Sequence, residues 1–360
     1  MGNGSGTVTG NTRARFEQWA KNPACRANTL SAVHNVPMAD VARRLGSRPS
    51  FGQSVFALTR GNNFERQILA DEADRLLAAL VRKDVLPEGA KGLADLRVRM
   101  NGGQLPSLPE AIARTNALIR ELAGQADSRS APRPAIIASP TVRIPRGVML
   151  PEAVLILDVL AVRYDRGRPE LMVGEIKTYA DRGGHTDLHK LAVARAQAGL
   201  YLHALELVLA ELGCGERVRL RRKGFLVLTR PGSNFPSVRA EEDLHYQAER
   251  ARRGFELLEA AARGLPPFMP VDDDPVEAVM RADTEYSEAC LRFCDRESQC
   301  HAAALEEGNP AVLGDDVRRF LGEVDLGRAV VLLDGGDPRT GGEKDLLRRL
   351  QRAGAAGPTP

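Results

Sequence analysis

Residues 155–182 read LILDVLAVRYDRGRPELMVGEIKTYADR, two apolar runs that flank a short polar turn. Asp158 interrupts the first run, and Glu175 and Lys177 interrupt the second. Both runs have the length and composition of buried strands, in which a charged side chain costs free energy unless another group pairs with it. The pattern therefore predicts that these three charges meet in one site.

A hairpin over this stretch would bring the three charges together. Side chains alternate between the two faces of a strand, so Glu175 and Lys177 point to the same face. If the hairpin folds symmetrically about the 166–167 turn, Asp158 lies directly opposite Glu175, with Cβ atoms roughly 5 Å apart. Two carboxylates at that distance repel unless a cation lies between them, and Mg²⁺ prefers such oxygen ligands. A register shift of one residue would turn Asp158 to the other face.

Lys177 would stand beside this cation, where an ammonium group can contact a phosphate or orient and deprotonate an attacking water. The alternative interpretation is a hairpin with exposed charges and a surface ion pair. Apolar neighbours argue against exposure of both faces; they are Leu155, Ile156, Leu157, Val159 and Ile176.

The pattern around the hairpin predicts strands between two helical regions. We expect helix over most of residues 13–123, including 62–84, where apolar residues recur at helical spacing. Strands are expected at 135–144, 153–162, 170–177 and 222–230. Further helices are expected at 188–212, capped by Thr186 or Asp187, at 241–264, and after VDDDP (271–275), which would cap the next one. The predicted segments are a disordered 1–12, a helical 13–130, a core at 131–235, a helical 236–307 and a partly flexible extension at 308–360.

Two further motifs lie outside the hairpin. Gln197 and Tyr201 are four residues apart in the predicted helix 188–212 and share one face; the alternative is an ordinary surface pair. Glu65 lies in the first turn of a predicted helix, where the alternative is an acid favoured by the helix dipole.

Five cysteines are present, and three of them crowd into CLRFCDRESQC, residues 290–300. An odd number argues against a disulfide framework. Cys290, Cys294 and Cys300 would need a fourth thiolate to hold an iron–sulfur cubane or a structural zinc, and Cys25 lies early in the chain. The alternative is a set of unrelated free cysteines. Cys214 is interpreted as an ordinary small residue.

Taken in order, these motifs resemble those of the PD-(D/E)XK nuclease superfamily, specifically its RecB-like branch. The resemblance rests on Asp158, on the triplet 175–177 and on Gln197 followed four positions later by Tyr201. RGNNFERQIL, residues 60–69, resembles the first motif of that branch, with Glu65 where many relatives carry His. The resemblance covers roughly residues 20–305. It implies a restriction-endonuclease-like α/β core, a mixed central sheet flanked by helices.

The resemblance also implies roles for these residues. Glu65, Asp158 and Glu175 would hold Mg²⁺ or Mn²⁺, and the backbone carbonyl of Ile176 would add a ligand. Lys177 would act on the attacking water or on the scissile phosphate. In the same scheme, the Gln197 and Tyr201 side chains would position the DNA strand.

Iron–sulfur members of the RecB-like branch, including nucleases of CRISPR adaptation and AddB-type subunits, use one early cysteine and three late ones. By this resemblance Cys25, Cys290, Cys294 and Cys300 would hold a [4Fe–4S] cluster. The middle spacing here is C-x3-C, whereas C-x2-C is the commoner one. Zinc is the alternative metal, for which His301 could compete as a ligand.

The function implied is metal-dependent DNA cleavage in phage defence, CRISPR adaptation or recombination repair, with a preference for single-stranded DNA or ends. The alternative is a non-cleaving iron–sulfur DNA-binding subunit of a larger complex. No P-loop is present, so a helicase or other partner would have to supply translocation. The balance of 50 basic and 47 acidic residues neither requires nor excludes nucleic acid. The absence of an apolar signal core and of a membrane span predicts a cytoplasmic protein.

Overall fold

The computed structural model describes residues 12–49, 51, 55–96, 106–124, 133–144, 149, 153–265 and 274–354. The chain forms two compact units. The first unites Met1–Ala14 with Gln53–Ala260, and the second unites Arg15–Gly52 with Ala261–Pro360. Of the helical regions expected at 13–130 and 236–307, only residues 15–52 and 261–307 share the second unit, and the rest belongs to the first.

A mixed sheet of seven strands forms the centre of the first unit, in the order β1-β2-β5-β6-β8-β9 with β7 also paired to β6. Neighbours β2/β5, β5/β6 and β8/β9 are antiparallel, whereas β1/β2 and β6/β8 are parallel. The strands are β1 (Leu93–Asp95), β2 (Ile136–Ala138), β3 (Thr141–Arg143), β4 (Val154–Ile156), β5 (Val159–Asp165), β6 (Arg168–Ala180), β7 (Arg219–Leu220), β8 (Lys223–Thr229) and β9 (Pro236–Asp243). Strands β3 and β4 form a separate two-stranded sheet.

Helices flank this sheet and make up the second unit. They are α1 (Thr12–Lys21), α2 (Arg26–His34), α3 (Met38–Arg44), α4 (Val55–Leu69), α5 (Asp74–Arg82), α6 (Leu108–Gly124), α7 (Leu188–Glu211), α8 (His245–Arg263), α9 (Pro275–Arg281), α10 (Glu297–Glu306), α11 (Asp315–Leu321), α12 (Leu326–Leu333) and α13 (Gly341–Arg352). The expectation of an α/β protein with a mixed sheet flanked by helices, and with helical N- and C-terminal regions, is confirmed. No helix in the described parts of the chain is both long enough and apolar enough to cross a membrane.

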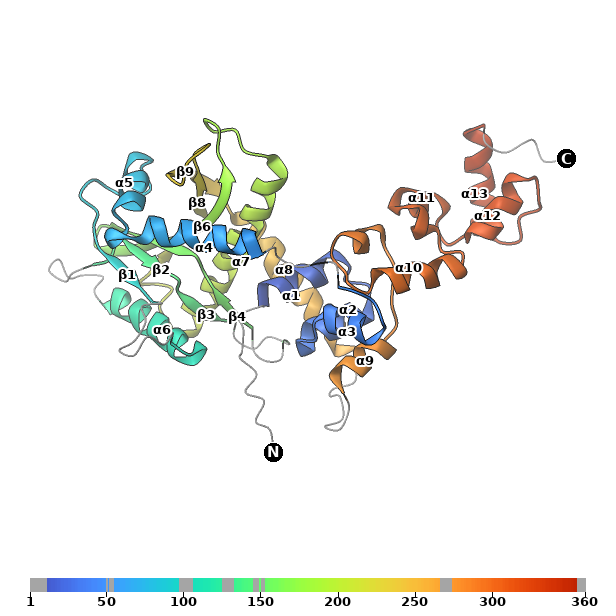
Figure 1. Ribbon diagram of the computed structural model, residues 1–360, viewed down its shortest axis with the longest axis horizontal. Helices are drawn as coiled ribbons and strands as arrows, with labels where there is room; N and C mark the ends of the chain where they lie inside the picture. The colour runs from blue at the N-terminus through green and yellow to red at the C-terminus, as the bar shows by residue number, and fades with distance from the viewer. Residues whose placement is uncertain are drawn as a thin grey trace. The chain divides into compact units, whose positions relative to one another are not determined.

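The two faces of the sheet carry different helices. Phe64 of α4 packs in the same core as Ile176 of β6, and α4 lies across the sheet in Figure 1. On the other face, Leu191 of α7 packs against Leu226 of β8. Glu175 is the register partner of Leu226 and therefore points to the α7 face.

The β5–β6 hairpin folds as the sequence predicts. Both residues of the 166–167 turn have positive φ, 50° and 87°, which is the geometry of a two-residue type I′ turn. Pairing runs from the turn to Val159 opposite Gly174. Continuing this register by one pair sets Asp158 opposite Glu175, so the expected register is confirmed.

Other expected boundaries are wrong. The strand expected at 153–162 is two strands, because the chain turns at Asp158 between β4 and β5. The helix expected at 62–84 breaks at 71–73, where three consecutive residues have positive φ although none is glycine. A short strand, β1, lies within the region expected to be helical.

The sequence analysis also missed β9, and the helix expected at 241–264 begins only at His245. An apolar pattern does not reveal this strand, because one of its inward-facing positions holds a charged residue, the buried Glu242. Arg195 and Arg239 pair with that carboxylate at 2.6 and 3.0 Å. The expected caps are confirmed, since the side chains of Asp187 and Asp274 accept hydrogen bonds from backbone N–H groups of α7 and α9.

The second unit has two cores. One packs α2, α3 and α9 around three of the cysteines, and the other joins α11, α12 and α13 through residues such as Leu332 and Leu346. The extension expected at 308–360 is therefore helical as far as the structure describes it. The disorder expected at 1–12, apart from Thr12, and residues 355–360 of the extension expected to be partly flexible lie outside the described residues.

Two helical glycines predict opposite responses to the same substitution. A Cβ at Gly199 of α7 would lie 2.3 Å from Cβ of Gln247 in α8 and 2.7 Å from its backbone carbon, whereas a Cβ at Gly61 of α4 would meet nothing within 4 Å. We expect Gly199→Ala to lower the free energy of unfolding by about 1–3 kcal/mol. Gly61→Ala should raise it by about 0.5–1 kcal/mol. Urea denaturation followed by circular dichroism measures both, and an equal effect of the two changes would contradict the close approach of α7 to α8.

Candidate active site and cysteine cluster

Asp158, Glu175 and Lys177 meet at the end of the hairpin. Oδ2 of Asp158 accepts a hydrogen bond of 2.8 Å from the backbone N–H of Ile176. The side chain of Glu175 is completely buried, at 0% exposure, and its Oε1 forms an ion pair with Nζ of Lys177. The structure thus brings together the three charges that the sequence singled out.

Local irregularities of the strands produce this arrangement. β5 begins only at Val159, so the carboxylate of Asp158 occupies the place where a ladder partner of Ile176 would lie. On the other side of β6, the pairing with β8 shifts between Ile176 and Ala180. A bulge of this kind redirects the side chains that follow, and such bulges are common beside active sites. Lys177 is the first residue of that shifted segment.

The environment of Glu175 disfavours its charged form. Burial, followed by the negative charge of Asp158, raises the pKa of Glu175 to about 8, against the opposing effect of Lys177 and Arg13. Burial alone would lower the pKa of Lys177, but the charges of Glu175 and Asp158 raise it above its usual value. Among the described residues, Oε2 of Glu175 has no hydrogen-bond partner. In the described part of the chain, this oxygen is therefore a buried acceptor without a protein donor.

Helix α7 lies on the same face as Glu175. Tyr201 is buried at 1% exposure, and its hydroxyl accepts a hydrogen bond of 3.2 Å from Nη1 of Arg13. Burial, and then the charges of Glu175 and Asp158, raise the pKa of Tyr201 well above its usual value, so the phenol stays protonated. Gln197, one turn earlier on the helix, is also buried. Tyr201 therefore belongs to the surroundings of the carboxylates.

Sequence reasoning missed Arg13. Its Nη1 lies 4.0 Å from Oε1 of Glu175 and also donates to Tyr201. The segment is anchored by Thr12, whose Oγ1 accepts a hydrogen bond of 2.9 Å from the backbone N–H of Val154. The preceding residues are rich in Gly, Ser, Thr and Asn, a composition that predicts disorder, and no motif marks the arginine.

Glu65 lies half-buried on α4, the helix whose Phe64 packs against the face of the sheet opposite to Glu175. Its role as a metal ligand stays a prediction.

Asp158 and Glu175 fit a hard divalent cation in donor chemistry and charge. They supply oxygen ligands, one of which lacks a partner, and Mg²⁺ usually completes its coordination with water. In the parts of the chain that the structure describes, no group of three or more His, Cys, Asp or Glu side chains is arranged to hold a metal ion. A cation here would therefore depend on two protein carboxylates, with water or a backbone oxygen for the rest.

The four cysteines of the expected cluster gather in the second unit. Cys25, Cys290 and Cys294 are buried in one core, and Cys300 packs against it. Burial raises the pKa of Cys294 to about 12, and the nearby thiols of Cys290, Cys300 and Cys25 act in the same direction. Four thiols in one apolar neighbourhood are donors of the kind that an iron–sulfur cluster or zinc requires, but in the described residues they are not arranged at metal-binding distances.

Hydrogen bonds hold the early and late cysteine segments together. Nδ2 of Asn22 donates to Sγ of Cys290 (3.3 Å) and to the carbonyl of Glu285 (2.7 Å). The backbone N–H of Ala27 donates to the carbonyl of Asp283 at 3.0 Å. An amide that donates to a cysteine sulfur is the kind of contact that supports a metal-bound thiolate. Cys214 lies in the first unit and takes no part.

Two further patterns in the sequence do not build a site in the described residues: a histidine pair four residues apart, which could bind a metal, and a basic run at 217–224, which could contact phosphate. His185 and His189 are exposed, in keeping with a solvent-facing helix start. In the basic run 217–224, Arg219 pairs with Glu170 at 3.0 Å and Lys223 pairs with Glu241 at 2.7 Å. The positive charges of that run are therefore partly neutralised.

Comparisons with protein-family models, with curated proteins and with solved structures find no match to this chain. What the site does is therefore inferred from its own chemistry and from the resemblance of its motifs.

The burial of Glu175 predicts a pH-dependent penalty in protein held free of metal. Because its pKa is raised from 4.5 to about 8 on folding, the folded state keeps a proton that the unfolded state releases, so stability falls as pH rises from about 4.5 to about 8. Glu175→Gln removes that penalty. With EDTA present, its free energy of unfolding should exceed that of the wild type by a few kcal/mol near pH 8, on the order of the pKa change, and by much less near pH 5.

Glu170→Gln provides a matched control on the same strand. Glu170 is also buried, but two arginines, Arg219 and Arg221, pair with it at 3.0 and 3.9 Å, so the substitution should destabilise the protein or leave it unchanged. Denaturant titrations at both pH values make the comparison. If Glu175→Gln is less stable than the wild type at pH 8, the charged carboxylate of Glu175 does not destabilise the metal-free protein.

Proposed function

We propose that this chain is a metal-dependent DNA nuclease of the PD-(D/E)XK type, with a restriction-endonuclease-like core. The observation that carries the proposal is the fully buried Glu175, with an unsatisfied oxygen, beside Asp158 and ion-paired to Lys177. A buried carboxylate that keeps an unsatisfied oxygen and has a second carboxylate beside it is costly in a purely structural role, whereas two such carboxylates suit a cation site. The mixed sheet, with an antiparallel hairpin joined through α7 to a parallel strand, agrees with such a core.

Asp158 and Glu175 would hold Mg²⁺ or Mn²⁺, joined by the backbone oxygen of Ile176 and by Glu65 if the resemblance extends to them. When bound, the metal supplies a Lewis acid and lowers the pKa of a coordinated water.

Lys177 stays protonated in this environment, because the carboxylates that flank it raise its pKa. Contact with a phosphate oxygen would neutralise charge on the phosphodiester, and the same ammonium group would help to orient the attacking water.

Tyr201 and Arg13 would have a positioning role. The neutral phenol accepts from Arg13 and keeps the guanidinium near Glu175, where it faces the same space as Lys177. Two cations beside two carboxylates can bind a phosphate on one side and a metal on the other. This arrangement favours phosphodiester hydrolysis over a non-cleaving DNA-binding subunit.

Cleavage assays test the proposal. Single- and double-stranded DNA with labelled ends should be cut in Mg²⁺ or Mn²⁺, faster for single strands or free ends. Asp158→Ala, Glu175→Ala and Lys177→Ala should each lower the rate by about 10³-fold or more, because each removes charge at the reacting phosphate or its metal. Lys83→Ala, at an exposed position after α5, is the control and should cut at the wild-type rate. If the Glu175→Ala variant cleaves DNA at the wild-type rate, this site does not carry out the reaction.

We also infer that Cys25, Cys290, Cys294 and Cys300 hold a [4Fe–4S] cluster that cross-links the early and late segments of the second unit. The convergence of the four thiols in one core supports this, as does the amide donor at Cys290. Zinc is the alternative. His301 is the remaining donor nearby in sequence, and its ring lies edge-on to Tyr286, with centroids 5.3 Å apart.

Metal analysis of protein purified without oxygen tests the cluster. We expect brown protein with about four irons per chain, and loss of both colour and iron in Cys290→Ala. Cys214→Ala is the matched control, since Cys214 lies in the other unit, and it should keep its iron. If the wild-type protein is colourless and contains one zinc and no iron, the four cysteines bind zinc and not an iron–sulfur cluster.

A further inference from the structure

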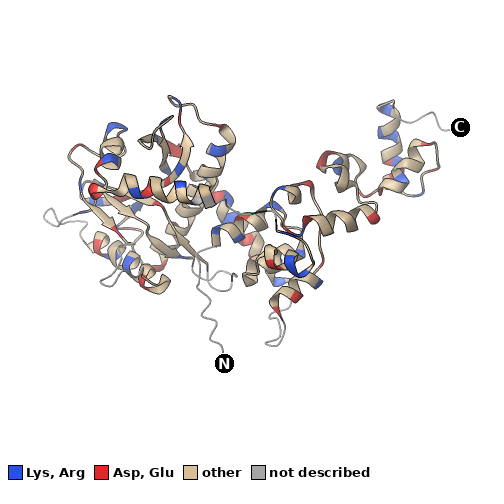
Figure 2. Ribbon diagram, in the orientation of Figure 1, with Lys and Arg blue, Asp and Glu red and all other residues tan. Residues whose placement is uncertain are grey.

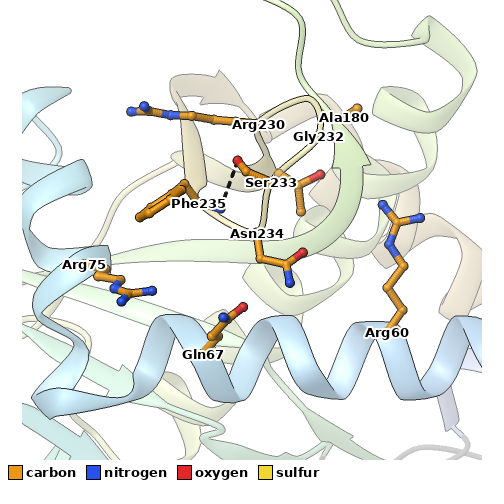
Figure 3. A pocket seen from close by; sticks show the side chains of 10 residues that line it. Arg60, Gln67, Arg75, Ala180, Arg230, Gly232, Ser233, Asn234 and Phe235 are labelled. Atoms are coloured by element: carbon orange, nitrogen blue, oxygen red, sulfur yellow. Dashed lines mark hydrogen bonds between the residues drawn. The ribbon is translucent and has the colours of Figure 1, made fainter.

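A pocket of about 560 Å³ opens in the first unit, away from the buried carboxylates. Helices α4 and α5 line one side, and the end of β6 with the loop 230–235, between β8 and β9, lines the other (Figure 3). The sequence analysis singled out none of its functional groups except the stretch containing Arg60.

The pocket carries positive charge without counter-charge. Arg60, Arg75 and Arg230 line it, and no lining residue is acidic. In the described parts of the chain none of the three pairs with a carboxylate; Arg60 donates to the carbonyl of Thr178 at 3.1 Å, and Arg75 lies 5.4 Å from the centre of the Phe235 ring. Elsewhere basic and acidic residues are interspersed (Figure 2). Three uncompensated guanidinium groups around one hollow favour an anionic ligand, and planar guanidinium groups suit phosphate.

The loop that closes the pocket is ordered by its own hydrogen bonds. Gly232 has φ of +69° after Pro231, and the N–H of Ser233 donates to the carbonyl of Arg230 at 3.2 Å, as in a type II turn. The N–H of Arg230 in turn donates to the carbonyl of Phe235 at 3.0 Å. These bonds fix the loop before any ligand binds, which lowers the entropy cost of binding.

Neutral groups in the pocket suit a base. The side chain of Asn234 points from the loop toward α4, where Gln67 projects toward it (Figure 3). Amide groups both donate and accept hydrogen bonds, as base edges do. The ring of Phe235 is 52% exposed in a chain with only 4% aromatic residues. An exposed aromatic ring provides a face on which a base can stack.

We propose that this pocket is a nucleotide subsite that holds one unit of a nucleic-acid strand. Arg60, Arg75 and Arg230 lie on different sides of the hollow and point in different directions (Figure 3), so each would contact a phosphate of the strand separately, and Phe235 would stack on a base. The strand that carries Lys177 leads into the pocket, because Ala180 lines it and is three residues further on, roughly 10 Å of extended chain. The pocket residues by themselves indicate a ligand that has a phosphate and a base. That this ligand is part of a longer DNA strand rests on the proposed nuclease function.

Binding measurements in EDTA test the subsite without cleavage. The probe is a fluorescein-labelled oligothymidylate, with thymidine monophosphate and inorganic phosphate as competitors. Arg60→Gln and Arg75→Gln should each weaken oligonucleotide binding about tenfold, the effect of one charge-assisted hydrogen bond, and reduce the salt slope by about 1. Phe235→Ala should weaken it by a similar factor, roughly tenfold, without changing the salt slope. Arg66→Gln is the matched control, since Arg66 is exposed on α4 outside the pocket.

Each outcome decides between the two proposals. Wild-type affinity and salt slope in the Arg60 and Arg75 variants would overturn the subsite, as would an absence of binding by the wild type. An oligonucleotide that binds no tighter than thymidine monophosphate would overturn the assignment to a strand. Weakened binding in the pocket variants, with no cleavage by the wild type in metal, would support the subsite and reject the nuclease. If the wild type cleaves DNA and the pocket variants bind the oligonucleotide as the wild type does, the nuclease is supported and the subsite is rejected.

Discussion

The hydrogen bond from the backbone of Ile176 to the carboxylate of Asp158 is the constraint on which the candidate active site depends. It ties the residue before β5 to Ile176 of β6, just beyond the last β5–β6 pair, Val159 with Gly174. Because one oxygen of Asp158 is used in this way, the carboxylate cannot turn away from Glu175. The two acids are therefore held together by the fold, and the repulsion between them remains as a property of the metal-free protein.

Much of this arrangement is predictable, because it follows from local rules. A glycine at position 167 permits the left-handed turn that fixes the hairpin register, and the period of two then places Glu175 and Lys177 on one face. Asp187 and Asp274 cap helices through contacts within three residues of sequence. The late cysteines are close in sequence and so must be close in space.

Other features depend on contacts that no local pattern carries. Arg13 reaches Glu175 from a segment distant in sequence and of low complexity. Strand β9 lacks a continuous apolar pattern because the charged Glu242 occupies a buried position. Arg195 of α7 and Arg239 of β9 pair with this carboxylate and offset the free-energy cost of burying it. The break at 71–73 uses left-handed backbone without glycine, a conformation that the local sequence does not predict. The side of the sheet on which Glu65 lies is likewise decided by the packing of Phe64.

The two-residue turn at 166–167 has a consequence for how this chain can vary in length. Asp158 and Glu175 lie opposite each other because they are equally far in sequence from that turn. One residue inserted into or deleted from either strand of the hairpin would therefore turn one carboxylate to the opposite face. Residues added in equal number to both arms at the tip would leave the pair in place. Homologous sequences that keep the site should therefore differ here only by symmetrical insertions, and a lone insertion should be accompanied by a bulge that restores the count.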